Sequence, residues 1–103
     1  MKELNLHSSK LGDKAGLQVV KTVLIHTQIE RLDVSNNGLG FKTGNALLQL
    51  LQGLPSYERR AISLQKLNLG LNIMSGKLVE RVYFELREVR ERQQSVISRS
   101  SFP

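Results

Sequence analysis

The stretch that decides the fold is residues 29–39, which read IERLDVSNNGL. Apolar residues occupy its first, fourth, sixth and eleventh places, and asparagine occupies the ninth. Leu32 and Val34 alternate with polar neighbours, so both point to one face of a short strand. Asn37 stands where the chain turns away, and its amide can bond backbone groups that the strand leaves unpaired. The spacing therefore predicts a strand and a turn, with the flanking apolar residues entering the same core.

The same spacing recurs on both sides of this stretch. Residues 64–74 match it at every place, with Met74 closing the pattern. Residues 1–11 match it with Ser9 in the place of asparagine, and serine makes fewer of the same bonds. The chain therefore divides into three units, residues 1–28, 29–63 and 64–94, followed by a serine-rich tail over 95–103 that we expect to be flexible.

Each predicted strand is followed by a segment with helical periodicity, over residues 14–26, 43–52 and 76–94. Asp13 is the predicted N-cap or first-turn acid of the first helix. Residues 56–61 have no counterpart in the first unit and are predicted to be an exposed insertion. When places are counted from the end of each strand pattern, nine apolar residues align and predict one recurring helix packing: Val19, Val20, Val23, Leu47, Leu48, Leu51, Val82, Tyr83 and Leu86.

A unit of this length, with Leu-Gly after the ninth-place asparagine, resembles the ribonuclease-inhibitor-like class of leucine-rich repeats. Residues 37–40 with Gly44, and residues 11–13 with Gly16, carry the resemblance. It implies an α/β solenoid of about three strand-turn-helix units. The class places a short parallel sheet on the concave side and helices on the convex side, and here the last helix is long.

The two ends of this repeat pattern differ from its middle. Val79 stands where the first two units have glycine, so the last helix is predicted to be a terminal cap or an arm that reaches a partner. The first unit begins within the pattern, so the apolar edge of Leu4 and Leu6 is expected to be exposed. Three explanations stay open: a fragment of a longer repeat array, a subunit covered by a neighbour in a larger assembly, or a self-associating chain.

Composition excludes several classes of function. The 103 residues contain no cysteine, and the two histidines show no metal-ligand spacing, so neither a metal nor a cofactor is predicted. No apolar run reaches membrane-spanning length and no signal peptide is visible, so we expect an intracellular protein, cytoplasmic or organellar, with no membrane partner. The net charge of +6 fits an acidic partner, nucleic acid included, but the even spread of basic residues also fits plain solubility.

The resemblance implies that ligands bind the concave strand face, which the outward places of each strand would form. The alternative is that this face is merely solvated and that the helices bind. The predicted partner-binding residues are Glu3, Asn5, His7, Glu30, Arg31, Asp33, Ser35, Lys66 and Asn68.

The last predicted helix offers a second set of candidates, Lys77, Arg81, Arg87 and Arg90, which could contact phosphates. Glutamates alternate with these cations, so a solvated helix face held by pairs four residues apart is the competing interpretation.

No catalytic residues are predicted. His7, Asp33 and Ser35 fall near one another, but the repeat alone produces that proximity, and nothing supplies a strained nucleophile turn or an oxyanion hole. The sequence therefore predicts a non-enzymatic leucine-rich repeat module, a scaffold for protein–protein interaction or assembly. The alternative is a basic structural subunit of a ribonucleoprotein or other large complex that contacts nucleic acid.

Overall fold

The computed structural model describes residues 2–53 and 62–100, with side chains described as far as residue 93. The chain alternates strand and helix, and the predicted α/β class is confirmed. One parallel sheet has the strand order β1-β2-β3. The elements are β1 (Glu3–Asn5), α1 (Gly12–His26), β2 (Arg31–Asp33), α2 (Phe41–Gly53), β3 (Lys66–Asn68) and α3 (Gly76–Ser100).

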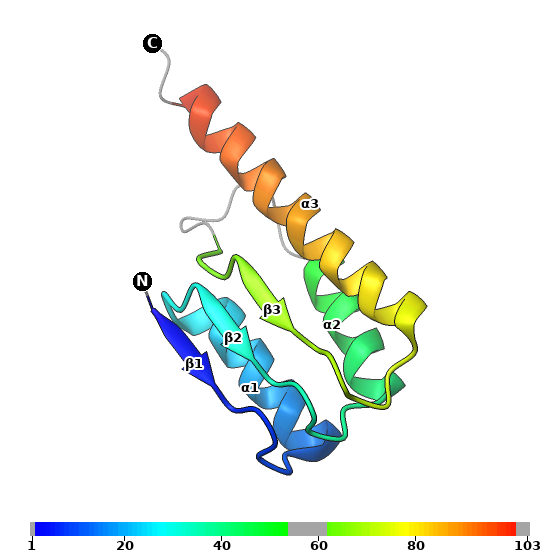
Figure 1. Cartoon of the computed structure of the whole chain (residues 1–103). Coiled ribbons are helices and arrows are strands. Elements are labelled where there is room, and N and C mark those ends of the chain that lie inside the picture. The colour runs from blue at the N-terminus through cyan, green and yellow to red at the C-terminus, as the bar shows by residue number, and fades with distance from the viewer. Residues whose placement is uncertain (1, 54–61, 101–103) are drawn as a thin grey trace.

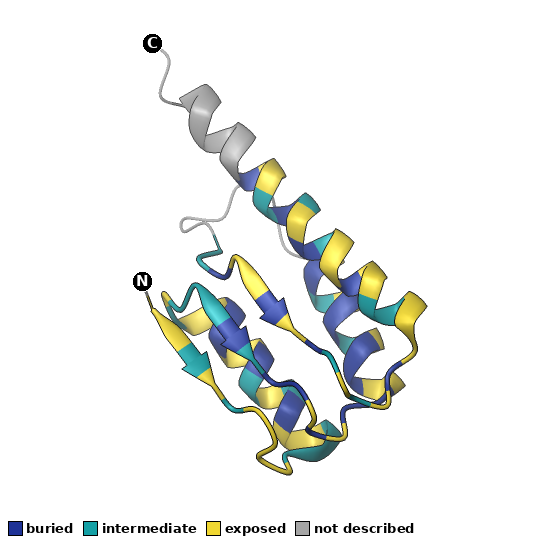
Figure 2. Cartoon of the chain, in the orientation of Figure 1, coloured by how far each residue is buried: buried dark blue, intermediate teal, exposed yellow. Residues whose placement is uncertain are grey.

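The helices take two positions relative to the sheet. In Figure 1, α1 lies behind the strands, α2 lies to the right of β3, and α3 runs beside β3 and across α2. Figure 2 shows that the buried residues gather where the strands and helices face one another. The sheet therefore has one face covered by helices and one face without a helix over it.

The strand register aligns one leucine from each strand. Leu4 pairs with Leu32, and Leu32 pairs with Leu67. Leu32 and Leu67 are buried, whereas Leu4 and the following Leu6 are only half-buried. The sequence predicted an exposed apolar edge at Leu4 and Leu6, and both side chains are more exposed than Leu32 and Leu67.

Asn37 links the second strand–helix unit to the first. Its side chain is 2 % exposed, and its Oδ1 accepts hydrogen bonds from the backbone N–H groups of Ser9 at 2.8 Å and Leu11 at 3.2 Å. Its Nδ2 donates to the carbonyls of Leu6 and Ser35, at 2.8 and 3.0 Å. One amide thus satisfies four backbone groups, three of which belong to the preceding unit.

Asn72 repeats this arrangement one unit later. Its Oδ1 accepts from the N–H groups of Asn37 at 2.8 Å and Leu39 at 3.1 Å. Its Nδ2 donates to the carbonyls of Val34 and Leu69. The two asparagines, predicted to bond turn backbone, therefore also join each unit to the one before it.

Two helical glycines allow the units to approach closely. A Cβ atom at Gly16 would overlap the Cδ2 atom of Leu39, a residue with no exposed surface. A Cβ atom at Gly44 would overlap Leu78 and would lie 2.9 Å from the sulfur of Met74. In each case a large side chain fills the space that a glycine leaves in the helix of the preceding unit. Leu39 fills the space at Gly16, and Leu78 with Met74 fills the space at Gly44.

The element boundaries differ from prediction mainly at α3. The first two helices begin two residues earlier than expected, and α3 continues past residue 94 to Ser100, so residues 95–100 of the predicted tail are helical. The predicted insertion over 56–61 lies outside the described residues. Of the nine aligned apolar residues, seven are buried, Val19 is half-buried, and Tyr83 is 37 % exposed.

Of the two predicted roles of Asp13, the first-turn acid of α1 is confirmed, and the N-cap is not, because Leu11 holds that position and Asp13 makes no capping bond to its own helix. Its Oδ1 instead accepts hydrogen bonds from the N–H of Gly40 at 2.8 Å, the N–H of Thr43 at 3.3 Å and the hydroxyl of Thr43 at 2.6 Å. The N-terminal ends of α1 and α2 lie side by side, so the carboxylate reaches the unpaired donors of the next helix. The bonds from Thr43 and Gly40 hold the pKa of Asp13 below its ordinary value of 3.8.

Replacing Asp13 with alanine should therefore destabilise the protein in a pH-dependent way. Because the folded-state pKa is depressed, the stabilisation is complete at neutral pH and is lost as the pH falls through the folded-state pKa. We expect a loss of about 1–2 kcal/mol at pH 7 and little loss well below pH 3.8, measured by urea unfolding. Glu91→Ala, at an exposed site on α3, is the control. An equal loss for Asp13→Ala at both pH values would contradict the assignment.

Candidate functional site

The candidate site is the sheet face away from α1 and α2, which we call the polar face. Along each strand its residues alternate with the leucines of the core, because successive side chains on a strand point to opposite faces. The parallel register places these residues in two rows across the sheet: Glu3, Arg31 and Lys66, then Asn5, Asp33 and Asn68.

The first row contains an ion pair at the β1–β2 end. Arg31 Nη1 lies 3.3 Å from Glu3 Oε1, and the two side chains are 42 % and 58 % exposed. An exposed pair of this kind contributes little to stability, because water and salt screen it. The pair nevertheless engages the charges of both Glu3 and Arg31. Lys66, the other cation of this row, pairs with no carboxylate among the described side chains.

The side chains of the second row already accept hydrogen bonds from backbone N–H groups two residues further along the chain. Asn5 Oδ1 accepts from the N–H of His7 at 2.9 Å, and Asn68 Oδ1 accepts from the N–H of Gly70 at 2.9 Å. Asp33 does the same with the N–H of Ser35. Each side chain therefore stabilises the turn that follows its strand, a common use of Asn and Asp. Hydrogen bonds from the Ser35 hydroxyl and N–H hold the pKa of Asp33 below its usual range.

The predicted proximity of His7, Ser35 and Asp33 is confirmed, and the order of their contacts is informative. Ser35 Oγ donates to Asp33 Oδ1 at 2.6 Å, and His7 Nδ1 lies 2.6 Å from the same Ser35 oxygen. Since that hydroxyl already donates to Asp33, it accepts its bond from His7. A nucleophilic triad places histidine between serine and the acid, whereas here the serine is in the middle. The chain of contacts instead ties the ends of β1 and β2 together.

Glu30 stands apart from the rows. It precedes β2 and is half-buried, and its backbone carbonyl accepts from the N–H groups of Gln65 at 2.8 Å and Lys66 at 3.1 Å. Its contribution is therefore to the pairing of β2 with β3.

A groove of about 600 Å³ lies between the polar face and α3. The strands contribute both rows of the polar face, and Gln65 and the three strand leucines also border the groove. The α3 helix contributes Tyr83, Leu86, Arg87 and Arg90.

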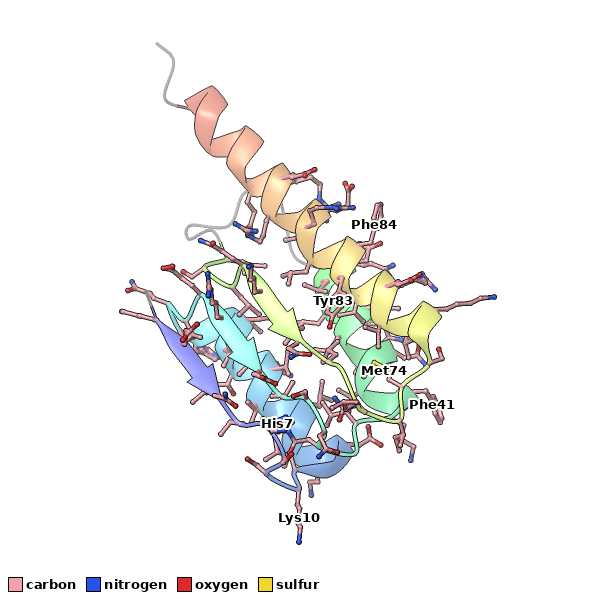
Figure 3. The ribbon with its side chains drawn as sticks, viewed as in Figure 1. His7, Lys10, Phe41, Met74, Tyr83 and Phe84 are labelled. Atoms are coloured by element: carbon pink, nitrogen blue, oxygen red, sulfur yellow. The ribbon has the colours of Figure 1, made fainter. Side chains whose placement is uncertain are left out.

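The α3 wall of the groove is held against the sheet by Tyr83. The hydroxyl of Tyr83 accepts a hydrogen bond from the N–H of Leu69, just after β3, at 2.9 Å. Figure 3 shows Tyr83 on the side of α3 toward β3 and Phe84 on its other side. The sequence analysis did not predict that α3 forms a wall of the groove. The tyrosine among aliphatic residues could have indicated it, because a tyrosine hydroxyl in such a place needs a polar partner.

The predicted phosphate contacts do not form one cluster. Lys77 and Arg81 line a second hollow on α3 together with Glu80 and Phe84, whereas Arg90 lines the groove. Arg87 borders both, and its guanidinium carbon lies 5.8 Å from the centre of the Phe84 ring. Of the oppositely charged residues four apart on this helix, Arg87 with Glu91 and Glu88 with Arg92 do not come within 4 Å of each other.

The turn after β3 carries an exposed leucine in an unusual backbone conformation. Leu71 has a φ of 56° and is 79 % exposed, and Ser8 and Asn36 occupy the same place with φ values of 56° and 54°. The turn geometry is thus common to all three units, while an exposed apolar side chain is particular to the third.

The described residues contain no group of three or more His, Asp or Glu side chains that could hold a metal ion. Within the same part of the chain, every helix is too short or too polar to cross a membrane. Comparison of the chain with known protein families, with curated proteins and with solved structures gives no match.

Proposed function

We propose that the chain is a non-enzymatic leucine-rich repeat module that binds a protein through the polar face of its sheet. The observation that carries the proposal is the pair of polar rows, in register across three parallel strands and bordered by the groove. Strands of fixed register present side chains in a flat array, so the variable places can select a partner while the leucines hold the frame.

Three features support the repeat assignment. The leucines of the three strands are aligned, Asn37 and Asn72 make equivalent bonds to the preceding unit, and glycine notches at two helices receive the next unit. We further propose that α3 is the terminal cap of the stack. Val79 occupies the place of the notch glycines, and its N–H bonds the carbonyl four residues earlier as Gly44 does. A further unit could not pack against Val79 in the way that the second unit packs against Gly16 and the third against Gly44.

Site-specific photo-cross-linking in a lysate of the native source tests the proposal. Benzoylphenylalanine replaces Asn5 or Asn68 on the polar face, and Gln18 or Gln49 at exposed sites on α1 and α2 as matched controls. We expect adducts with a protein partner from the first pair and none from the second. Adducts from the helix sites alone, or from no site, would contradict the proposal.

The second candidate is a basic structural subunit that contacts nucleic acid. The net charge of +6 and the meeting of Lys66, Arg87 and Arg90 at the groove favour it. Each phosphate contact should add about 0.9 to the slope of log affinity against log salt concentration, because it releases a counterion. Binding that is insensitive to salt would contradict the nucleic-acid candidate, and protein binding would be the one candidate left.

A further inference from the structure

We propose that the groove binds an acidic segment of the partner protein, with its carboxylates over Lys66, Arg87 and Arg90. This inference rests on the proposed function and adds the chemistry of the partner. The first step is the charge of the groove. Four cationic and two acidic side chains line it, and both acids are already engaged, Glu3 by Arg31 and Asp33 by Ser35.

The three remaining cations pair with no carboxylate among the described side chains. They come from two neighbouring elements, β3 and α3, that both line the groove. An acidic segment over this part of the groove would meet positive charge from both elements, whereas a surface cation on one helix alone offers only a screened contact.

The α3 wall of the groove is fixed before any partner arrives. Tyr83 bonds the backbone of Leu69, and Leu86 and Val89 are 5 % and 1 % exposed against the core. Gln93 Oε1 accepts from the N–H of Ile62 at 2.8 Å, which ties the same helix to the chain before β3. Because the arginines stand on a held helix, binding loses less conformational freedom than it would on a mobile one.

The distribution of charge also gives the segment a direction. The acids of the groove lie at its β1–β2 end and the unpaired cations at its β3–α3 end. A protein segment can match this by placing its acidic residues at one end and neutral residues at the other. A nucleic acid cannot, because its phosphates repeat along the strand and would meet Glu3 and Asp33.

Fluorescence anisotropy with three labelled probes tests the inference on the full chain: a peptide alternating glutamate and leucine, a peptide alternating lysine and leucine, and oligothymidylate. We expect the glutamate peptide to bind and the lysine peptide not to bind. Changing Lys66→Glu, Arg87→Glu and Arg90→Glu together should weaken the glutamate peptide by at least about a hundredfold. Lys66→Gln, Arg87→Gln and Arg90→Gln form a milder variant if the first fails to fold.

The matched control carries Lys14→Glu, Lys21→Glu and Lys42→Glu, which change the net charge equally at exposed sites on α1 and α2. We expect it to retain most of the binding. An equal loss in the control, equal binding of the lysine peptide, or tighter binding of oligothymidylate would each overturn the inference. If cross-links from the polar face persist in the groove variant, the proposed function stands and this inference alone fails.

Discussion

Replacing Asn37 with leucine, whose side chain has the same number of non-hydrogen atoms but no hydrogen-bonding group, is expected to lower the free energy of unfolding by about 3–5 kcal/mol. The change leaves four backbone groups without the partner that Asn37 supplies. Asn37 is almost fully buried, so water cannot readily replace the lost bonds. Urea unfolding followed by circular dichroism measures the effect.

Asn45 provides the matched control. It lies on the exposed side of α2, so Asn45→Leu should change stability by no more than about 0.5 kcal/mol. Similar losses at positions 37 and 45 would mean that the asparagine amide does not join the first two units.

The second large effect is expected at Gly44, where valine should destabilise the protein by about 3 kcal/mol. On an exposed helix the loss of glycine would be favourable by up to about 1 kcal/mol, so the sign of the change is diagnostic. The added Cβ would overlap Leu78 and press on Met74, both of which pack from the third unit. Thermal or urea unfolding of the variant gives the difference directly.

Gly76 and Leu78 supply the controls for this prediction. A Cβ atom at Gly76 meets nothing within 4 Å, so Gly76→Ala should be neutral or slightly stabilising. Adding Leu78→Ala to Gly44→Val should recover about 1–2 kcal/mol relative to the sum of the single changes, because it reopens the notch. Strict additivity would show that Gly44 and Leu78 are not in contact.

The strands, their register and the role of the asparagines could be predicted because they depend on short-range periodicity repeated three times. Alternation at Leu32 and Val34 defines the faces of one strand, and repetition then aligns the others. The same alignment placed Tyr83 on the side of its helix that packs toward the strands, but it did not show that its hydroxyl accepts a hydrogen bond from the N–H of Leu69. The end of α3 was also missed, because serine-rich composition was taken as tail.

Contacts that depend on how elements lie in space could not be predicted from the chain alone. Asp13 has the sequence position of a cap for α1, and only the side-by-side placement of two helix ends makes it a cap for α2. The two polar rows were visible in the sequence, but the groove was not, because its second wall requires the direction of α3 beside β3. The same holds for Ser35, whose middle position between His7 and Asp33 follows from the turn geometry.

Every proposal about the polar face requires that the strand leucines share the opposite face, side by side. Nuclear Overhauser effects between methyl groups, in protein labelled at leucine and valine methyls, test this most directly. Cross-peaks should join Leu4 to Leu32 and Leu32 to Leu67, as the parallel register requires. A Leu32 that shows contacts to neither of the other two would contradict the stacked units and, with them, the polar face as a partner-binding surface.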